Sequence, residues 1–241
     1  MRGRTRLPLV GRSLAIVPKS PESALPSEPR RLLLATTNPH KIEELRAILA
    51  GLPYELVSPN DIELALEVKE TGTTFAENAI LKATAWANAA GMLTLAEDSG
   101  LEIDALGGEP GVYSARWAGD EVSYQERFRI LLGRLADMPA ERRTARYRAA
   151  MVIARPAPVG VLGLFEGTLE GQIALAPAGN GGFGYDPIFY VPEQQRTVGQ
   201  MSAEGKHLIS HRARAAVAAR ELLRQLAETP ANEPPQPDER H

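Results

Sequence analysis

The sequence predicts an α/β fold, and three stretches carry that prediction. A short continuous apolar run over Leu32–Ala35 is typical of a buried strand, and it leads through a polar turn into a helical pattern. Apolar residues alternate with a two-residue period between Leu93 and Ala105, and again within Arg146–Thr168. Helical periodicity returns between these strands and at the end of the chain. Such a mixture of strands and helices is typical of α/β proteins.

The composition limits the class of protein. The chain has 241 residues, which suits one large domain or two small ones, and its hydrophobic content of 44% is ample for a core. It has no cysteine, which removes disulfides, thiolate catalysis and cysteine-ligated zinc and fits a reducing compartment. No apolar run approaches the length of a membrane helix. We therefore expect a cytoplasmic location and no membrane partner.

Charge is distributed unevenly along the chain. The first 31 residues hold seven Lys and Arg against two Asp and Glu, whereas the whole chain has a formal net charge of −3. The body is therefore acidic, and it is a poor general binder of nucleic acid because phosphate contacts need many cations. We expect no nucleic-acid partner. Phosphates, if bound, would meet a few cations in one pocket, together with a metal.

The two ends differ in composition from the body. Residues 1–30 mix Arg, Pro and Ser with short apolar pieces, and residues 229–241 are rich in Pro. We predict disordered extensions that flank one domain over 31–228. For the first segment, a targeting peptide and a misassigned start codon are the alternatives.

The first strand and helix have the features of an anion site. The turn between them reads Thr36, Thr37, Asn38, Pro39, His40 and Lys41. Asn38 suits the N-cap and Pro39 the first helical position. A helix N-terminus offers free N–H groups and a favourable dipole to a phosphate. Lys41 is unfavourable for the helix itself, which favours a ligand role, although many such units bind nothing.

A short strand over Tyr54–Val57 precedes a second predicted helix, from Thr74 to Ala90. Thr74 and Glu77 have the spacing of a capping box. Asn78 and Lys82 lie four residues apart and therefore share one helical face. From the residues alone, a solvated polar face is the favoured interpretation of that pair.

The stretch from Leu93 to Gly108 is the most informative in the chain. Its alternation predicts two strands, with Glu97, Asp98, Ser99 and Gly100 at the break between them. Carboxylates at a strand end are costly to bury unpaired, but they suit Mg²⁺, which prefers oxygen ligands. The alternative is an acidic turn whose glycine serves the backbone geometry.

Further elements follow in order. A helix is predicted over Tyr124–Leu135, a hairpin from Arg146–Arg155 and Val159–Thr168, and another short strand over Gly171–Ala176. A last helix extends to about Ala227.

Two glycine-rich segments imitate known motifs. Gly179–Gly184 reads G-x-G-x-x-G, but a strand bounded by prolines follows where a dinucleotide fold needs a helix, so we reject that fold. The glycines would let the backbone approach a ligand, with Phe183 or Tyr185 offering a ring face; a glycine-rich hairpin with core aromatics is the alternative. Gly199–Lys206 has one residue too many for a P-loop.

A histidine pair lies near the start of the last helix. His207 and His211 have the spacing of a zinc protease motif, but Leu208 replaces its glutamate, so we predict no zinc. His211 and Arg212 can instead present a ring and a guanidinium to a polar ligand.

Five motifs in order resemble the inosine/xanthosine triphosphate pyrophosphatase family, whose members hydrolyse non-standard purine nucleoside triphosphates. They read TTNPHKIEEL, ETGTTFAENAILKA, AEDSGLEIDALGGEPGVYSARWAG, GGFGYDPIF and EGKHLISHRARA, from about Leu32 to Ala227. The resemblance implies an elongated mixed central sheet flanked by helices, with two lobes and a substrate cleft between them. It also implies a homodimer, a small-molecule nucleotide substrate and a requirement for Mg²⁺.

The resemblance further implies roles for individual residues. Asp98 and Lys82 would be catalytic, Asp98 would activate water, and Glu70 and Asp98 would bind the metal. Phe183 would stack on the base, while Lys206, His211 and Arg212 would read the purine edge. The implied substrate-binding residues are Thr36, Thr37, Asn38, Pro39, His40, Lys41, Ser99, Phe183, Gly184, Tyr185, Asp186, Lys206, His211 and Arg212. The chain departs from many members at Thr37 and His40, where they have glycine, and at Glu97, where they have Asp.

The residues and the resemblance point to the same chemistry. Mg²⁺, a few lysines and a helix N-terminus would neutralise the triphosphate of ITP, dITP or XTP while water attacks the α-phosphorus and pyrophosphate leaves. A pyrophosphatase with a different base preference is one alternative, and a non-catalytic nucleotide-binding regulator is another. Pyrophosphate release under Mg²⁺ separates the enzyme from the regulator.

Overall fold

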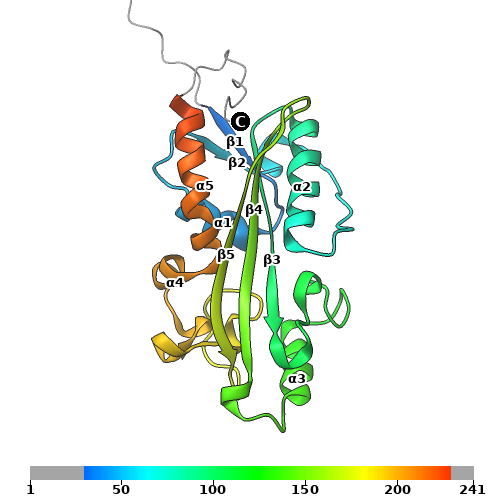
Figure 1. The fold of residues 1–241 in the computed structure, drawn as a ribbon, viewed down its shortest axis with the longest axis vertical. Helices are drawn as coiled ribbons and strands as arrows, with labels where there is room; N and C mark the ends of the chain where they lie inside the picture. Colours follow the sequence, from blue (N-terminus) through cyan, green and yellow to red (C-terminus); the bar gives the residue numbers. More distant parts are fainter. Residues whose placement is uncertain (1–29, 229–241) are drawn as a thin grey trace, which may run out of the picture.

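Seven strands form one mixed sheet in the order β2-β1-β3-β4-β5-β6-β7 (Figure 1). β1 pairs in parallel with β2 and β3, and every later pairing is antiparallel. The structure is a computed structural model that describes residues 30–228. The predicted extensions, apart from Arg30, lie outside the described residues. The predicted α/β class, with a mixed sheet flanked by helices, is confirmed.

The elements have the following bounds. The strands are β1 Arg31–Leu34, β2 Glu55–Val57, β3 Thr94–Ile103, β4 Thr144–Arg155, β5 Gly160–Ile173, β6 Phe189–Val191 and β7 Arg196–Thr197. The α-helices are α1 Pro39–Ile48, α2 Phe75–Ala90, α3 Tyr124–Arg134, α4 Ala203–Ile209 and α5 His211–Glu228. None of the helices in residues 30–228 is long and apolar enough to cross a membrane.

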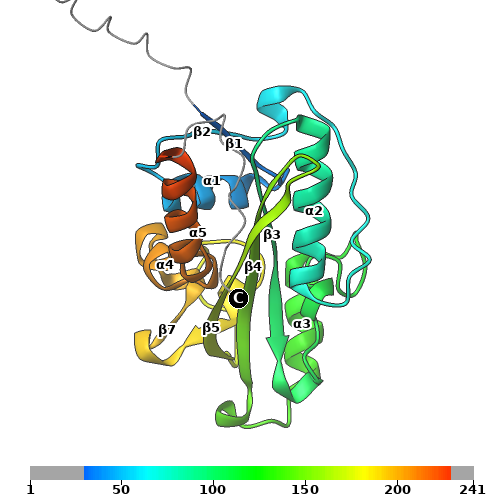
Figure 2. The ribbon, with the colours of Figure 1, turned by 45° about the horizontal axis from the view of Figure 1, so that its top comes forward.

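The long strands β3, β4 and β5 form the spine of the molecule, with α5 on one side and α2 on the other (Figures 1 and 2). Alternate residues of β4 pack on opposite faces of the sheet. Met151 and Ile153 pack with α1 and α5, while Val152 and Ala154 pack with α2. α3 lies toward the opposite end of the long strands from α2 and packs in a third cluster around Tyr147.

The predicted starts of α1 and α2 are confirmed. They could be predicted because local hydrogen bonds determine them. The Asn38 side chain accepts from the backbone N–H groups of His40 and Lys41, at 3.0 and 3.3 Å, and so caps α1. At α2, Thr74 and Glu77 form the predicted capping box. Each cap satisfies amides that have no partner inside the helix.

The predicted break at the acidic stretch is wrong. β3 is one continuous strand, and it pairs with β4 residue by residue from Thr94 opposite Ala154 to Ile103 opposite Ala145. Glu97 and Asp98 lie within the continuous strand, where Lys82 of α2 pairs with Asp98 and Arg212 of α5 pairs with Glu97. The cost of burying the two charges is thereby offset, and no strand end is needed.

The separate strand predicted over Gly171–Ala176 is also wrong. β5 continues without interruption to Ile173. A Cβ on Gly171 would lie 2.5 Å from the carbonyl oxygen of Tyr190, so this glycine allows β6 to approach β5 closely. Gly171 therefore serves strand pairing and does not mark a turn.

Candidate active site

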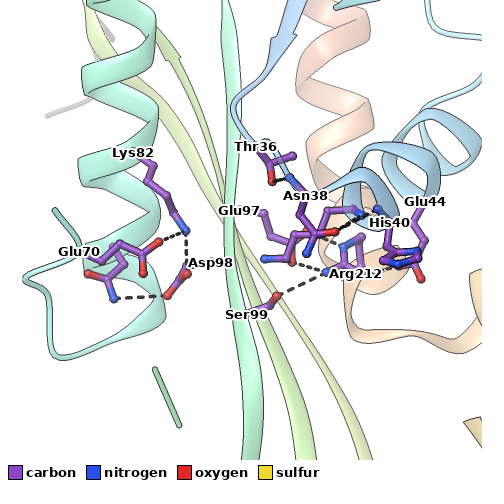
Figure 3. Close-up of polar contacts among 12 residues, drawn as sticks. Thr36, Asn38, His40, Glu44, Glu70, Lys82, Glu97, Asp98, Ser99 and Arg212 are labelled. Carbon is purple, nitrogen blue, oxygen red and sulfur yellow. Dashed lines mark hydrogen bonds and ion pairs between the residues drawn. The ribbon is translucent and has the colours of Figure 1, made fainter. Parts of the chain in front are cut away.

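The two adjacent acids of β3 belong to different charge clusters. Because successive side chains of a strand point to opposite faces, Glu97 faces α5 and Asp98 faces α2. Figure 3 shows the two clusters on either side of the strand. Both side chains are largely buried, with Glu97 3% and Asp98 6% exposed.

On the α2 side, one ammonium joins two carboxylates. The Nζ of Lys82 lies 2.7 Å from Oδ1 of Asp98 and 2.8 Å from Oε1 of Glu70 (Figure 3). Glu70 precedes α2 and also accepts from Nη1 of Arg116 at 3.2 Å. We call these four residues the Lys82 cluster.

Asn78 supports the Lys82 cluster from the same helix. It is fully buried, and its amide donates to Asp98 at 3.4 Å while its Oδ1 accepts from the N–H of Gly72 at 2.8 Å. The solvated polar face predicted for Asn78 and Lys82 is therefore wrong, because this face of α2 packs on β3. The amide instead ties Asp98 to the loop that carries Glu70.

The charges of Lys82 and Glu70 stabilise each other within this cluster. Burial lowers the pKa of Lys82, but the charges and hydrogen bonds of Asp98 and Glu70 outweigh it, so the pKa lies above its ordinary value. Burial raises the pKa of Glu70, but Lys82 and Arg116 outweigh it, so the pKa lies below its ordinary value. Lys82 therefore stays cationic and Glu70 stays anionic.

Two carboxylates of the Lys82 cluster are the residues predicted to bind magnesium. Within residues 30–228 no group of three or more His, Cys, Asp or Glu side chains could hold a metal by itself. Mg²⁺ at such sites is usually bound by one or two carboxylates together with substrate phosphates and water. Glu70 and Asp98, which share one ammonium, fit that pattern, and their metal role stays a prediction.

On the α5 side, a buried guanidinium joins two more acids. Nε and Nη2 of Arg212 contact the two carboxylate oxygens of Glu97 at 2.6 and 2.7 Å, and Nη1 contacts Glu44 of α1. Such a two-pronged pair fixes orientation as well as charge. Arg212 is 1% exposed, so most of its donors serve this network.

The network continues to the segments expected to bind base and phosphate. The Nζ of Lys206 lies 2.7 Å from Glu44 and 2.7 Å from Asp186, and the Nζ of Lys41 lies 3.7 Å from Glu97. Arg212 and Lys41 hold the pKa of Glu97 well below its ordinary value despite burial. Glu97 is thus anionic, and it connects Arg212 with Lys41, which are predicted to bind the base and the phosphates.

A pocket lies beside this network. Its lining residues are Asn38, Lys41, Ser99, Gly100, Leu101, Ser114, Ala115, Tyr124, Tyr147, Phe183, Gly184, Tyr185, Asp186, Lys206, His211 and Arg212. Ten of the fourteen predicted substrate-binding residues are therefore brought together. The other four are Thr36 and Thr37 in the adjoining turn and Pro39 and His40, the first two residues of α1.

The edge of β3 connects the pocket with the Lys82 cluster. β1 pairs with β3 only at Thr94 and Leu95, so beyond Leu95 no strand of the described residues pairs with this edge. A ligand that lies across the edge can contact Ser99 on one face and Asp98 on the other.

The predicted base-stacking ring contacts both subsites. Phe183 stacks on His40, with ring centroids 5.2 Å apart and planes 8° apart. The Nζ of Lys206 lies 4.5 Å from the centre of the Phe183 ring, and Cζ of Arg212 lies 5.7 Å from it. His40, one of the departures from glycine, therefore links the phosphate loop to the base side.

Comparison with known proteins identifies the family of this chain. The profile of the Ham1 family matches residues 32–222. The chain belongs to the Ham1 family. A dITP/XTP pyrophosphatase of Symbiobacterium thermophilum is 53% identical over 199 residues, which cover 83% of this chain and 98% of the relative. One of Streptomyces coelicolor is 48% identical over 198 residues, with coverage of 81% and 98%.

Solved structures of Ham1 proteins have the same fold. The Staphylococcus aureus Ham1 protein superposes with a TM-score of 0.73 at 38% identity, over 82% of this chain and all of that one. A Mycobacterium abscessus structure titled nucleoside-triphosphatase / dITP/XTP pyrophosphatase has a TM-score of 0.63 at 40% identity, over 78% and 98%.

Two glycines of the segment Gly179–Gly184 pack against the protein's own chain. A Cβ on Gly179 would lie 2.1 Å from the carbonyl oxygen of Gly199, and one on Gly182 would lie 2.0 Å from the Asp186 carboxylate. The close approach that these two glycines allow is to neighbouring protein atoms, whereas the sequence interpretation assigned it to a ligand. They fix the segment that carries Phe183.

Several residues of this Ham1 site escaped sequence reasoning. Glu44 looks like an ordinary surface acid within IEEL, and Tyr147 looks like a core residue of an alternating strand. In the structure, Tyr147 stacks on His211 at 4.8 Å and donates to Asp186 at 3.1 Å. Ser114 and Tyr124 also line the pocket, and no local pattern marks them.

Proposed function

We propose that this Ham1 protein hydrolyses the non-canonical purine nucleoside triphosphates ITP, dITP and XTP to the nucleoside monophosphate and pyrophosphate, in a reaction that requires Mg²⁺. The names of the relatives support the reaction class. The observation that carries the proposal is the pairing of Lys82 with both Glu70 and Asp98 beside an open strand edge. Two carboxylates and an ammonium suit a triphosphate with its metal.

The phosphate chain would meet positive charge from several elements. The α1 N-terminus, Lys41 and Lys82 can neutralise phosphate oxygens. Glu70 and Asp98 would hold Mg²⁺, which when bound stabilises negative charge on the phosphates. Burial lowers the pKa of Lys41, although Glu97 opposes the shift, so this lysine is more readily neutralised than an exposed one. A bound phosphate would favour its charged form.

The Asp98 carboxylate would accept a proton from the attacking water. The new bond forms between the water oxygen and the α-phosphorus, and the bond from the α-phosphorus to its bridging oxygen breaks, so pyrophosphate leaves. Lys82 holds the position of Asp98 at 2.7 Å and can balance charge on the leaving group.

The base would lie against Phe183, with polar groups at its edge. His211 is 6% exposed and lines the pocket, and its Nδ1 has no hydrogen-bond partner within residues 30–228. Burial and the neighbouring Arg212 hold the pKa of His211 well below its ordinary value, so the ring is neutral. A neutral imidazole has one donor and one acceptor, which suits a purine edge.

The remaining expectations are part of the same proposal. We infer a homodimer in the cytoplasm that has no nucleic-acid partner; the family resemblance and the absence of cysteine support this. Size-exclusion chromatography coupled to light scattering measures the oligomeric state directly. A monomer at micromolar concentration would contradict the dimer without affecting the proposed chemistry.

The test is product analysis with purified protein, ITP and Mg²⁺. We expect IMP and pyrophosphate in equal amounts, and no reaction when EDTA replaces Mg²⁺. Inosine diphosphate with orthophosphate would place the cleavage at the wrong phosphorus. Tight nucleotide binding without any product would support the regulator, and a faster reaction with a pyrimidine triphosphate would support the different base preference.

A further inference from the structure

The segment Ser114–Gly119, called the 114–119 loop here, lies along the open edge of β3. The Oγ of Ser114 accepts from the N–H of Leu101 at 2.9 Å and donates to the carbonyl oxygen of Gly111 at 2.6 Å. Gly100 permits this approach, because a Cβ there would lie 2.4 Å from the Oγ of Ser114. The first residue of the loop is therefore anchored to the edge of β3 at Leu101.

The 114–119 loop contacts both halves of the site. Ser114 and Ala115 line the pocket, and the carbonyl of Ser114 accepts from the hydroxyl of Tyr185 at 3.0 Å. Two residues further on, Arg116 donates to Glu70 at 3.2 Å. A shift of this loop would therefore move a pocket wall and a partner of Glu70 together.

One buried arginine holds the two ends of the loop. Arg127 of α3 is 2% exposed, and its Nη1 and Nη2 donate to the carbonyl oxygens of Ala115 at 2.7 Å and Gly119 at 2.9 Å. No acid pairs with it in any ion pair of the described residues, and its Nε has no partner there. Burial of a guanidinium is costly, and here hydrogen bonds to two backbone carbonyls of one loop help to offset that cost.

Arg127 also stands next to the aromatic wall of the pocket. Its Cζ lies 4.9 Å from the ring centre of Tyr124, and that ring meets Tyr185 edge-on at 5.3 Å. Arg127 itself does not line the pocket. It can act on a ligand only through the loop and these rings.

We propose that Arg127 is a positioning residue for nucleotide binding, which fixes the 114–119 loop against the open edge of β3 and so sets the pocket wall formed by Ser114 and Ala115. The inference rests on the proposed function for the identity of the nucleotide. The proposal predicts that loss of the Arg127 guanidinium weakens nucleotide binding more than it slows the chemical step.

Arg143 provides a matched control. It is also a buried arginine, at 4% exposed, and it donates to the carbonyl oxygens of Leu135, Met138 and Ala174, away from the pocket lining. Removal of either guanidinium takes away hydrogen bonds that tie separate backbone segments together. Both substitutions should therefore lower the melting temperature, but only Arg127 should change binding.

The experiment compares Arg127→Gln, Arg127→Lys and Arg143→Gln by KM and kcat for ITP and by calorimetric Kd for IMP. We expect Arg127→Gln to raise KM and Kd by at least about fivefold, because misplaced binding groups cost affinity, with a smaller change in kcat. Arg127→Lys keeps the charge but loses the two-donor geometry of the guanidinium. This variant should fold, and its KM and Kd should rise less than those of Arg127→Gln. Arg143→Gln should leave KM and Kd within about twofold of wild type by the same reasoning.

Unchanged KM and Kd in Arg127→Gln, or equal rises in Arg143→Gln, would overturn the positioning role. If Arg127→Gln does not fold, Arg127→Lys decides, and wild-type binding by that variant would overturn the role. Wild-type protein in the same assays separates the two proposals. Absence of turnover in wild type contradicts the proposed function, whereas the IMP dissociation constants still test Arg127.

Discussion

Glu97 and Asp98 are neighbours in β3, yet their carboxylates pair with cations on opposite faces of the sheet. Glu97 is joined to Arg212 by contacts of 2.6 and 2.7 Å, and Asp98 lies 2.7 Å from Lys82. The strand geometry thus assigns the adjacent acids to two tasks. Glu97 orders the base-side network, and Asp98 faces the cluster assigned to the chemistry.

Asp98→Asn should abolish most turnover without unfolding the protein. Lys82 keeps Glu70 as a partner, so the fold survives, but the amide cannot accept the proton from water. We expect kcat for ITP to fall by about a hundredfold or more, the usual contribution of a general base. Steady-state kinetics at saturating Mg²⁺ and a melting curve test this, and a near-normal kcat would remove Asp98 from the mechanism.

Glu97→Gln should act mainly on stability and nucleotide binding. The substitution leaves the fully buried Arg212 with Glu44 as its remaining acid, and loss of one partner of a buried pair costs about 3 kcal/mol. We expect Glu97→Gln to lose more unfolding free energy than Asp98→Asn, and Asp98→Asn to lose more kcat than Glu97→Gln. Urea unfolding of both variants checks the order, and the reverse order would contradict the division of tasks.

Stability should fall in acid, with Glu97 as a main cause. Its pKa in the folded state lies below the ordinary glutamate value of 4.5, so its stabilisation is complete above pH 4.5 and is lost as the pH falls below it. Glu44 and Glu70 shift in the same direction, whereas burial raises the pKa of Asp186, which has the opposite sign.

The measurement is urea unfolding of wild type and Glu97→Gln between pH 7 and pH 3. The difference in unfolding free energy between the two proteins should narrow below pH 4.5, because glutamine does not titrate. A difference that stays constant with pH would show that Glu97 ionisation does not stabilise the fold.

Gly100→Ala should damage the fold at the open edge of β3. The added Cβ would lie 2.4 Å from the Oγ of Ser114 and 2.5 Å from the carbonyl of Gly111, so the loop must shift, at a cost of about 2 kcal/mol. Gly133→Ala is the control, because the Cβ meets nothing within 4 Å on α3 and helix propensity predicts a gain of about 0.5 to 1 kcal/mol. Equal effects of the two substitutions would contradict the close approach at Gly100.

Sequence reasoning succeeded where the determining contacts are local. The caps at Asn38 and Thr74 depend on amides two or three residues away, and their pattern is readable in the chain. The resemblance of five motifs to a known family predicted substrate-binding residues, and ten of those fourteen residues line the pocket. Both the helices and the family resemblance could therefore be predicted.

The errors have a common physical cause. Glu97 looked like part of a turn because its partner, Arg212, lies 115 residues further along the chain. Gly100 looked like a turn glycine for the same reason, since the loop that needs its missing side chain is not adjacent in sequence. Asn78 looked solvated because nothing in α2 alone shows which face packs on β3. The environments of Glu97, Gly100 and Asn78 are all determined by contacts with residues that are not adjacent in the sequence.

We expect the pocket beside Glu97 to select a purine with a 6-oxo group. An amino group at that position leaves buried donors unpaired, at about 1–3 kcal/mol each, so two mismatches give a preference of about a hundredfold or more. The most direct test is the ratio of kcat/KM for ITP to that for ATP, from pyrophosphate release by wild-type protein. We predict a ratio of about a hundred or higher, and equal specificity constants for the two nucleotides would contradict the account.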